Sequence, residues 1–220
     1  MTTPTTHERY GQAMRTCLLA FACGLACIGL LLSGCATPLE TKMIDVPPQY
    51  LDLEGRTVAV LASVDPSVQA RHPDAVANLI RGVSGRIVEN VPNARVAEPD
   101  KVRAFQRANP AWPTERPARL IQALGVERLI VLDVAEYRTH EPGNAAIREG
   151  LIQANVDLYE AESRDPDERS LTASVEGRFP RNRSVGEVTA SAESVEIAAL
   201  ADFCLRAAGV FHEHEVPEDR

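Results

Sequence analysis

Histidine and cysteine offer this chain its clearest chances of metal binding or catalysis. The segment His212-Glu213-His214 places two imidazoles beside a carboxylate, but the third and fourth ligands that zinc normally requires are not nearby. Cys204 could act as a thiol nucleophile with His212 as its base. However, Cys204 lies in an apolar stretch with helical spacing, where we expect a buried and unreactive thiol.

Other motifs that carry chemistry are missing from the sequence. There is no Gly-x-Ser-x-Gly elbow, no phosphate-binding glycine loop and no dinucleotide fingerprint. The acidic segment Asp165-Pro166-Asp167-Glu168 lacks the alternating ligands and central glycine of a calcium loop, so we interpret it as a hairpin turn. We therefore expect no catalytic residue, no metal site and no cofactor.

A further cysteine, Cys35, ends a segment that has the features of an export signal. Arg9 and Arg15 precede an uncharged run over residues 17–32, and Ser33 and Gly34 are small. A basic start, an apolar centre of about 15 residues and a small-residue end define a secretory signal. The run falls short of the roughly 20 residues that cross a bilayer comfortably, although an uncut transmembrane anchor is the alternative.

The segment Leu32-Ser33-Gly34-Cys35 resembles the lipobox of bacterial lipoproteins. In that family the cysteine is diacylated, the chain is cut just before it, and the new amino group is acylated. The resemblance implies that Cys35 carries the lipid and becomes the mature amino terminus, which holds the chain at a membrane. By analogy with the sorting of enterobacterial lipoproteins, Ala36 in place of aspartate after the cysteine favours the outer membrane over the inner. We expect a lipid-anchored protein of the cell envelope that faces the periplasm.

Cleavage at this point leaves 186 residues, enough for one domain with a real core. The loss of Glu8, Arg9 and Arg15 changes the formal charge from −8 to −9. An acidic body argues against nucleic acid as a partner, because Lys and Arg should then be in excess. Cys204 is left as the free thiol, so no internal disulfide is expected. Residues 35–52, rich in proline, are predicted to form a flexible tether.

Apolar periodicity predicts a single α/β domain over residues 53–211. A buried strand at 56–63 is followed by an amphipathic helix at 74–90, in which Gly82 and Gly85 indicate close packing on the sheet. Residues 93–97 could form a weak edge strand, and short helices are expected at 101–108 and 118–124.

The second half of the domain alternates between apolar and polar residues. Segments 128–137, 147–159 and 171–179 predict an antiparallel three-strand meander with one face in water. A long helix at 186–211 should cover this mixed sheet together with helix 74–90, and residues 212–220 should form a polar tail.

The strand Arg56-Thr57-Val58-Ala59-Val60-Leu61, the entry Leu124-Gly125-Val126 before Leu129-Ile130, the alternating hairpin and the covering helix support a second resemblance. The domain resembles periplasmic lipoproteins of the curli-secretion and penicillin-binding-protein-activator type, and the amino-terminal domain of the Tol translocation protein. In that group the domain is an interaction module and not an enzyme. The resemblance implies an interaction or assembly role for this chain.

Two surfaces could bind an envelope protein partner. One is the edge near Val96, which would offer unpaired backbone groups, and the other is the wet face with Gln153, Asn155 and Asp157. A face that is merely solvated is the alternative. Trp112 could either plug a core edge or serve as an exposed anchor. The alternative function is an envelope hydrolase or metal-dependent enzyme with a dispersed site, and the oligomeric state is left open.

Overall fold

We describe a computed structural model in which residues 43–144, 148–181 and 191–217 are described. The leader, the lipobox with Cys35 and residues 36–42 of the expected tether lie outside the described residues, as does the start of the expected helix at 186–211. Met43–Arg220 forms one compact unit.

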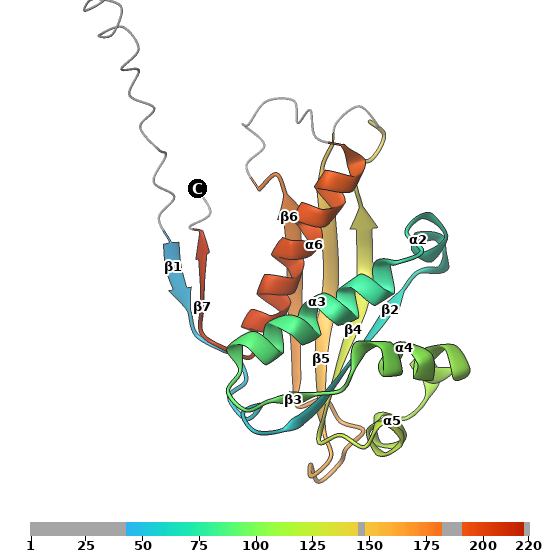
Figure 1. Cartoon of the computed structure of the whole chain (residues 1–220), viewed down its shortest axis with the longest axis vertical. Coiled ribbons are helices and arrows are strands. Elements are labelled where there is room, and N and C mark those ends of the chain that lie inside the picture. Colours follow the sequence, from blue (N-terminus) through green and yellow to red (C-terminus); the bar gives the residue numbers. More distant parts are fainter. Residues whose placement is uncertain (1–42, 145–147, 182–190, 218–220) are drawn as a thin grey trace, which may run out of the picture. The chain divides into compact units, whose positions relative to one another are not determined.

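A five-stranded mixed sheet forms the centre of the domain, with the order β3-β2-β4-β5-β6 (Figure 1). β2 (Thr57–Val64) pairs in parallel with β3 (Arg95–Val96) and with β4 (Arg128–Arg138). β4, β5 (Gly150–Glu160) and β6 (Leu171–Phe179) form an antiparallel meander. The predicted α/β fold, with its mixed sheet and three-strand meander, is therefore confirmed.

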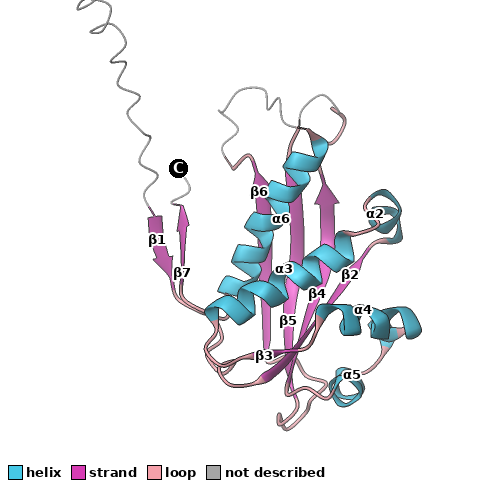
Figure 2. Cartoon of the chain, viewed as in Figure 1, coloured by secondary structure: helices cyan, strands magenta, loops and turns pink. Residues whose placement is uncertain are grey.

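Two long helices cross the same face of this sheet (Figure 2). They are α3 (Ala75–Asn90) and α6 (Ala192–Gly209). The shorter α4 (Pro99–Ala108), the 3-10 turn η1 (Trp112–Thr114) and α5 (Pro117–Leu124) connect β3 to β4. α5 ends where Gly125 adopts φ 66°, a left-handed conformation that glycine adopts without strain.

A further short helix, α2 (Pro66–Arg71), lies between β2 and α3. Asp65 caps it by accepting a hydrogen bond from the Ser67 N–H at 2.7 Å, and Pro66 provides a pre-set first helical position. Aspartate and proline favour both turns and helix starts, so the pattern alone does not separate the two.

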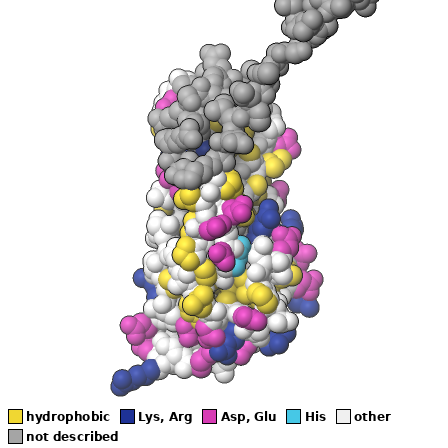
Figure 3. Space-filling view, turned by 90° about the vertical axis from the view of Figure 1, so that its left-hand side faces the viewer, with side chains coloured by type: hydrophobic (Ala, Val, Ile, Leu, Met, Phe, Trp, Pro, Cys, Tyr) yellow, Lys and Arg dark blue, Asp and Glu magenta, His cyan; other side chains and the backbone are white. Residues whose placement is uncertain are grey.

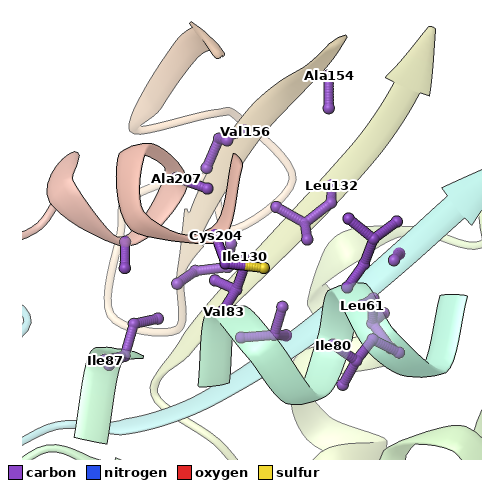
Figure 4. Packing of buried hydrophobic residues seen from close by; sticks show 14 of the residues in the cluster. Leu61, Ile80, Val83, Ile87, Ile130, Leu132, Ala154, Val156, Cys204 and Ala207 are labelled. Atoms are coloured by element: carbon purple, nitrogen blue, oxygen red, sulfur yellow. The ribbon is translucent and has the colours of Figure 1, made fainter. Parts of the chain in front are cut away.

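The core lies between the sheet and the two covering helices. Ile80, Val83 and Ile87 of α3 point toward Ile130 and Leu132 of the sheet (Figure 4). All five side chains are fully buried. The apolar stripe predicted for helix 74–90 therefore faces the core.

The two chain ends add a ribbon that the sequence does not indicate. β1 (Met43–Val46) pairs antiparallel with β7 (His214–Pro217), and the N–H groups of Gln49 and Tyr50 both donate to the Val210 carbonyl. Residues 43–52 therefore belong to the folded unit and are not a free tether, and residues 214–217 are not a frayed tail. The reason is backbone pairing between segments far apart in sequence, which local composition does not reveal.

A buried arginine fastens the incoming chain to the end of the sheet. The Arg128 side chain is completely buried and donates hydrogen bonds to Tyr50 Oη at 2.7 Å, to Glu162 Oε2 at 2.7 Å and to the Asp52 carboxylate. Burial alone would lower the pKa of Arg128, but the bonds to Glu162 and Tyr50 raise it above its ordinary value. Tyr50 and Asp52 are thus held by a permanent cation.

Candidate functional site

One face of the meander carries a row of short polar side chains. The register places Ser63 of β2 beside Asp133 of β4, Asp133 beside Asn155 of β5, and Asn155 beside Ser174 of β6. Partners in register point to the same side of a sheet. We call these four residues the polar row. Three of them are exposed and Ser63 is half-buried.

The polar row lies on the face of the sheet opposite α3 and α6. The neighbouring positions Ala154, Val156, Ile130 and Leu132 are buried and point to the helices (Figure 4), and side chains alternate along a strand. Within residues 43–144, 148–181 and 191–217, no side chain of the polar row has a hydrogen-bond partner. Strands disfavour Asp and Asn, so these groups cost β-propensity without a bond in return.

The predicted wet face is present, but its three residues differ in access. Asn155 is exposed and Gln153 is half-buried, so both side chains are accessible to a partner. Asp157 is only 7% exposed, because it accepts hydrogen bonds from Thr172 Oγ1 at 2.7 Å and pairs with Arg169 at 3.0 Å. Asp157 therefore holds the side chains of Thr172 and Arg169 in place and is not itself a contact residue. The sequence does not reveal this, since both partners lie on the next hairpin arm.

A pocket of about 630 Å³ opens on the same face, beyond the polar row. Val131, Tyr159 and Thr172 form its floor on three strands, while Trp112, Pro113 and Leu120 come from η1 and α5. Trp112 is only 7% exposed, so it plugs a core edge, as one of the two interpretations predicted. Its exposed margin nevertheless lines the pocket.

The β5–β6 turn closes the other side of this pocket. Asp167 accepts a hydrogen bond from the Ala118 N–H at 2.9 Å and from the guanidinium of Arg116, so the turn is bound to the start of α5. These bonds, that from Ala118 first, hold the pKa of Asp167 below its ordinary value. The acidic segment 165–168 is thus a hairpin turn, as predicted, and also a pocket wall.

The second predicted contact surface, the edge near Val96, is short. Arg95 N–H donates to the Arg56 carbonyl at 2.8 Å and Ala97 N–H donates to the Val58 carbonyl at 2.7 Å. The intervening Val96 N–H is therefore directed away from β2, toward the outside of the sheet. A strand of two residues offers little room for strand addition.

The residues with chemical potential are not assembled into a catalytic set. Cys204 is 4% exposed between α3 and the sheet, and burial raises its pKa to about 12, so the thiol stays protonated at neutral pH. His214 is part of β7 and its ring packs on Gly209. The His212 and His214 rings are 5.7 Å apart, and no group of three potential metal ligands occurs in the described part of the chain.

One polar constellation was not foreseen. Glu196 of α6 accepts a hydrogen bond from Tyr137 Oη at 2.7 Å, and the same carboxylate oxygen lies 3.1 Å from His72 Nδ1. Burial and the bond to Glu196 raise the pKa of Tyr137. This constellation ties α2, β4 and α6 together. Tyr137 lies 65 positions after His72 and 59 positions before Glu196, so no local sequence pattern marks this constellation.

Charged side chains are distributed over the surface in mixed sign. Figure 3 shows one face of the molecule, on which acidic, basic and apolar side chains alternate over the described residues. Among residues 43–144, 148–181 and 191–217, no helix combines the length and apolarity needed to span a bilayer.

Fold and site together define a small α/β domain in which α3 and α6 cover one sheet face, while the other face is open at the polar row and bears η1 and α5 beside it. No known family matches the sequence. No curated protein matches it either.

Solved structures with partial similarity to this chain include the following three. PelC from Paraburkholderia phytofirmans, described as a dodecamer, is 10% identical, with a TM-score of 0.45 over 79% of this chain and 99% of that chain. Lipoprotein GNA1162 from Neisseria meningitidis is 16% identical, with a TM-score of 0.42 over 59% and 88%. Protein CT253 from Chlamydia trachomatis is 14% identical, with a TM-score of 0.37 over 56% and 71%. Values this low do not establish kinship.

Proposed function

We propose that this protein is a lipid-anchored module of the bacterial cell envelope, facing the periplasm, that works by binding an envelope protein and not by catalysis. The polar row is the observation that carries the contact role. The lipobox at residues 32–35 is the support for the anchor, with the outer membrane favoured by Ala36.

The residue types of the polar row favour a role in binding, because they lower the β-propensity of the strands that carry them. Ser63, Asp133, Asn155 and Ser174 stand in register across four strands, and two of them are residues that strands disfavour. A face selected only for solubility and sheet stability would carry Thr or long charged residues at such positions. Departures from local rules of this kind are typical of functional sites, where a partner supplies the missing hydrogen bonds.

The open face also has the physical character of a transient protein interface. It presents the uncharged polar side chains of Ser63, Asn155 and Ser174, and the 630 Å³ pocket at its end adds aromatic and aliphatic walls. Interfaces between proteins that come apart again are polar and hydrated, with a small apolar centre. The α3–α6 face is already covered and is not available in this way.

A second candidate function, an envelope hydrolase, is favoured by one observation. Glu196 orients the imidazole of His72, an arrangement that can prepare a general base. Cys204 does not supply the nucleophile, because its thiol is buried and protonated. If the hydrolase function held, purified protein would turn over an ester, amide or glycoside substrate, and His72→Gln would abolish that turnover.

The anchor is tested with Cys35→Ser. In cells, the wild-type chain should lose residues 1–34, incorporate labelled palmitate and fractionate with membranes. The variant should incorporate no palmitate and remain as uncut precursor. A Cys35→Ser chain that is cut after Gly34 and still remains with the membrane would contradict lipid anchoring.

The contact role is tested with Asn155→Arg, which places a long cation at the centre of the polar row. Asn90→Arg on α3 is the matched control, since Asn90 is exposed and belongs to the helix-covered side. Partners captured from cross-linked membranes should be lost with Asn155→Arg and kept with Asn90→Arg. Val96→Pro, which removes an outward N–H and no bond to β2, tests the edge instead.

A further inference from the structure

The pocket contains two hydrogen-bond donors that lack acceptors. Trp112 is 7% exposed and Tyr159 is 8% exposed, and both line the pocket. The Tyr159 hydroxyl accepts a bond from Arg169 Nε at 3.2 Å, but neither its O–H nor the indole N–H of Trp112 donates to any residue that the structure describes. The indole nitrogen of Trp112 is not sealed in the protein interior, and Tyr159 lines the pocket. Buried Trp and Tyr normally find an acceptor, so these two donors are available to a ligand.

One part of the pocket wall is aliphatic and held in place. Pro113, Pro117, Leu120 and Val131 line it, and the two prolines and the Asp167 bridge fix the wall that carries Trp112. A recess of about 630 Å³ is in the range of sites that hold a few residues of a peptide. It therefore combines aromatic rings, aliphatic walls and side-chain donors.

Such a site matches a ligand whose backbone offers acceptors and few donors. The pocket lies on a sheet face, where the backbone groups of β4 and β5 are already paired, so strand addition cannot take place there. A proline-containing segment lacks N–H groups at its prolines and adopts polyproline II, which leaves its carbonyls unpaired and costs little entropy to bind. Aromatic-lined grooves are the usual receptors for such segments.

The charged side chains at the rim of the pocket favour one type of residue beside the prolines of the ligand. The lining carries three carboxylates, from Glu115, Asp167 and Glu168, against one cation, Arg169. Asp167 is bound to Arg116, and Arg169 is bound to Asp157. Glu168 is exposed and forms no ion pair with a described residue. A lysine or arginine beside the prolines would complement it.

We infer that the pocket between Trp112 and Tyr159 binds a proline-containing, extended segment of a partner protein with a basic residue beside the prolines. Trp112 N–H and Tyr159 O–H donate to carbonyls of that segment, and its proline rings pack on Leu120 and Val131. The inference rests on the proposed function only in taking a protein as the partner. It specifies the chemistry of that partner, which the open face does not.

Trp112 is the only tryptophan of the chain, so its fluorescence reports directly on the pocket. The full chain in lipid nanodiscs is titrated with a decaproline peptide that carries one lysine at each end. Two further peptides replace every proline by alanine, or both lysines by glutamate. We expect a saturable change of Trp112 emission with the first peptide, and at least tenfold weaker binding of the alanine peptide. The glutamate peptide should bind more weakly than the first at low salt.

Variants then assign the donors, with binding followed by the anisotropy of a labelled peptide. Trp112→Phe and Tyr159→Phe each remove one donor and keep a ring, so each should weaken binding about tenfold. Tyr137→Phe removes a hydroxyl on the opposite face of the sheet and should leave binding unchanged. If Trp112→Phe fails to fold by circular dichroism, Tyr159→Phe decides the outcome.

The results separate this inference from the proposed function. The inference is overturned if no proline peptide changes Trp112 emission, if the alanine peptide binds equally well, or if Tyr159→Phe binds like the unaltered chain. In each case, partner capture that is lost with Asn155→Arg would leave the proposed function standing. Conversely, tight peptide binding together with capture that is insensitive to Asn155→Arg would support the pocket and contradict the contact role of the polar row.

Discussion

Replacing Gly82 by alanine tests how closely α3 and α6 approach each other. A Cβ atom at Gly82 would lie 2.4 Å from the Cys204 Sγ and 3.4 Å from the Cys204 Cβ. Figure 4 shows Cys204 on α6 with its sulfur directed toward Val83 of α3. Because carbon and sulfur atoms in contact need about 3.5 Å or more, the helices or the sulfur must move by about 1 Å.

The expected magnitude is the sum of two opposing effects. Overpacking a well-filled core costs about 1–3 kcal/mol, whereas glycine to alanine inside a helix gains about 1 kcal/mol. Gly85 provides the matched control, since it belongs to the same helix and a Cβ there meets nothing within 4 Å. Gly85→Ala should therefore stabilise by about 1 kcal/mol. The two variants should differ by about 1–3 kcal/mol, with Gly82→Ala the less stable.

Urea unfolding of residues 36–220 measures both free energies, provided that the m-values agree. A third variant, Cys204→Ala, removes the sulfur and leaves the contact at 3.4 Å. In that background Gly82→Ala should lose most of its penalty, which would appear as a coupling energy of about 1–3 kcal/mol. If both glycine variants stabilise equally, or if the Gly82→Ala penalty persists without the sulfur, the close approach of the two helices is wrong.

Three further outcomes follow from the packing and charges. Ile80→Ala should lower the free energy of unfolding by about 2–5 kcal/mol, and a loss below about 0.5 kcal/mol would reverse the face of α3 that we assign to the core. The bond from Arg128 lowers the pKa of Glu162 below its ordinary 4.5, so this contribution to stability is complete above pH 4.5 and is lost as the pH falls below it. The urea midpoint should therefore drop in acid, and less steeply in Arg128→Leu; equal slopes would contradict the pairing. Cys204 should resist a maleimide at neutral pH until urea unfolds residues 36–220, and rapid labelling of the folded chain would contradict its burial.

Local patterns were sufficient to predict the main elements of the fold. The stripe of Ile80, Val83 and Ile87 recurs with helical spacing, and the alternation around Asn155 marks a strand with one wet face. Each signal comes from residues within a single helix or strand, so contacts with distant parts of the chain do not change it. Gly82, but not Gly85, proved to mark a close approach, and the contact is with α6 and not with the sheet.

Features made by distant segments could not be predicted. The ribbon of β1 and β7 pairs residues that are more than 160 positions apart, for example Val46 with His214. Asp157 has the pattern of an exposed strand residue, yet Arg169 and Thr172 enclose it after the chain has turned. In the same way, Trp112 meets Tyr159 in one pocket only because α5 is bound to the β5–β6 turn.

The anchored contact role is tested most directly by photo-cross-linking in living cells. A photoreactive amino acid replaces Asn155 on the open face in one strain and Asn90 on α3 in another, with both chains at wild-type levels. We predict that ultraviolet light yields a discrete adduct with one membrane or periplasmic protein from position 155 and none from position 90. If position 155 gives no adduct, or if both positions give the same ones, the open face of the sheet is not the binding surface.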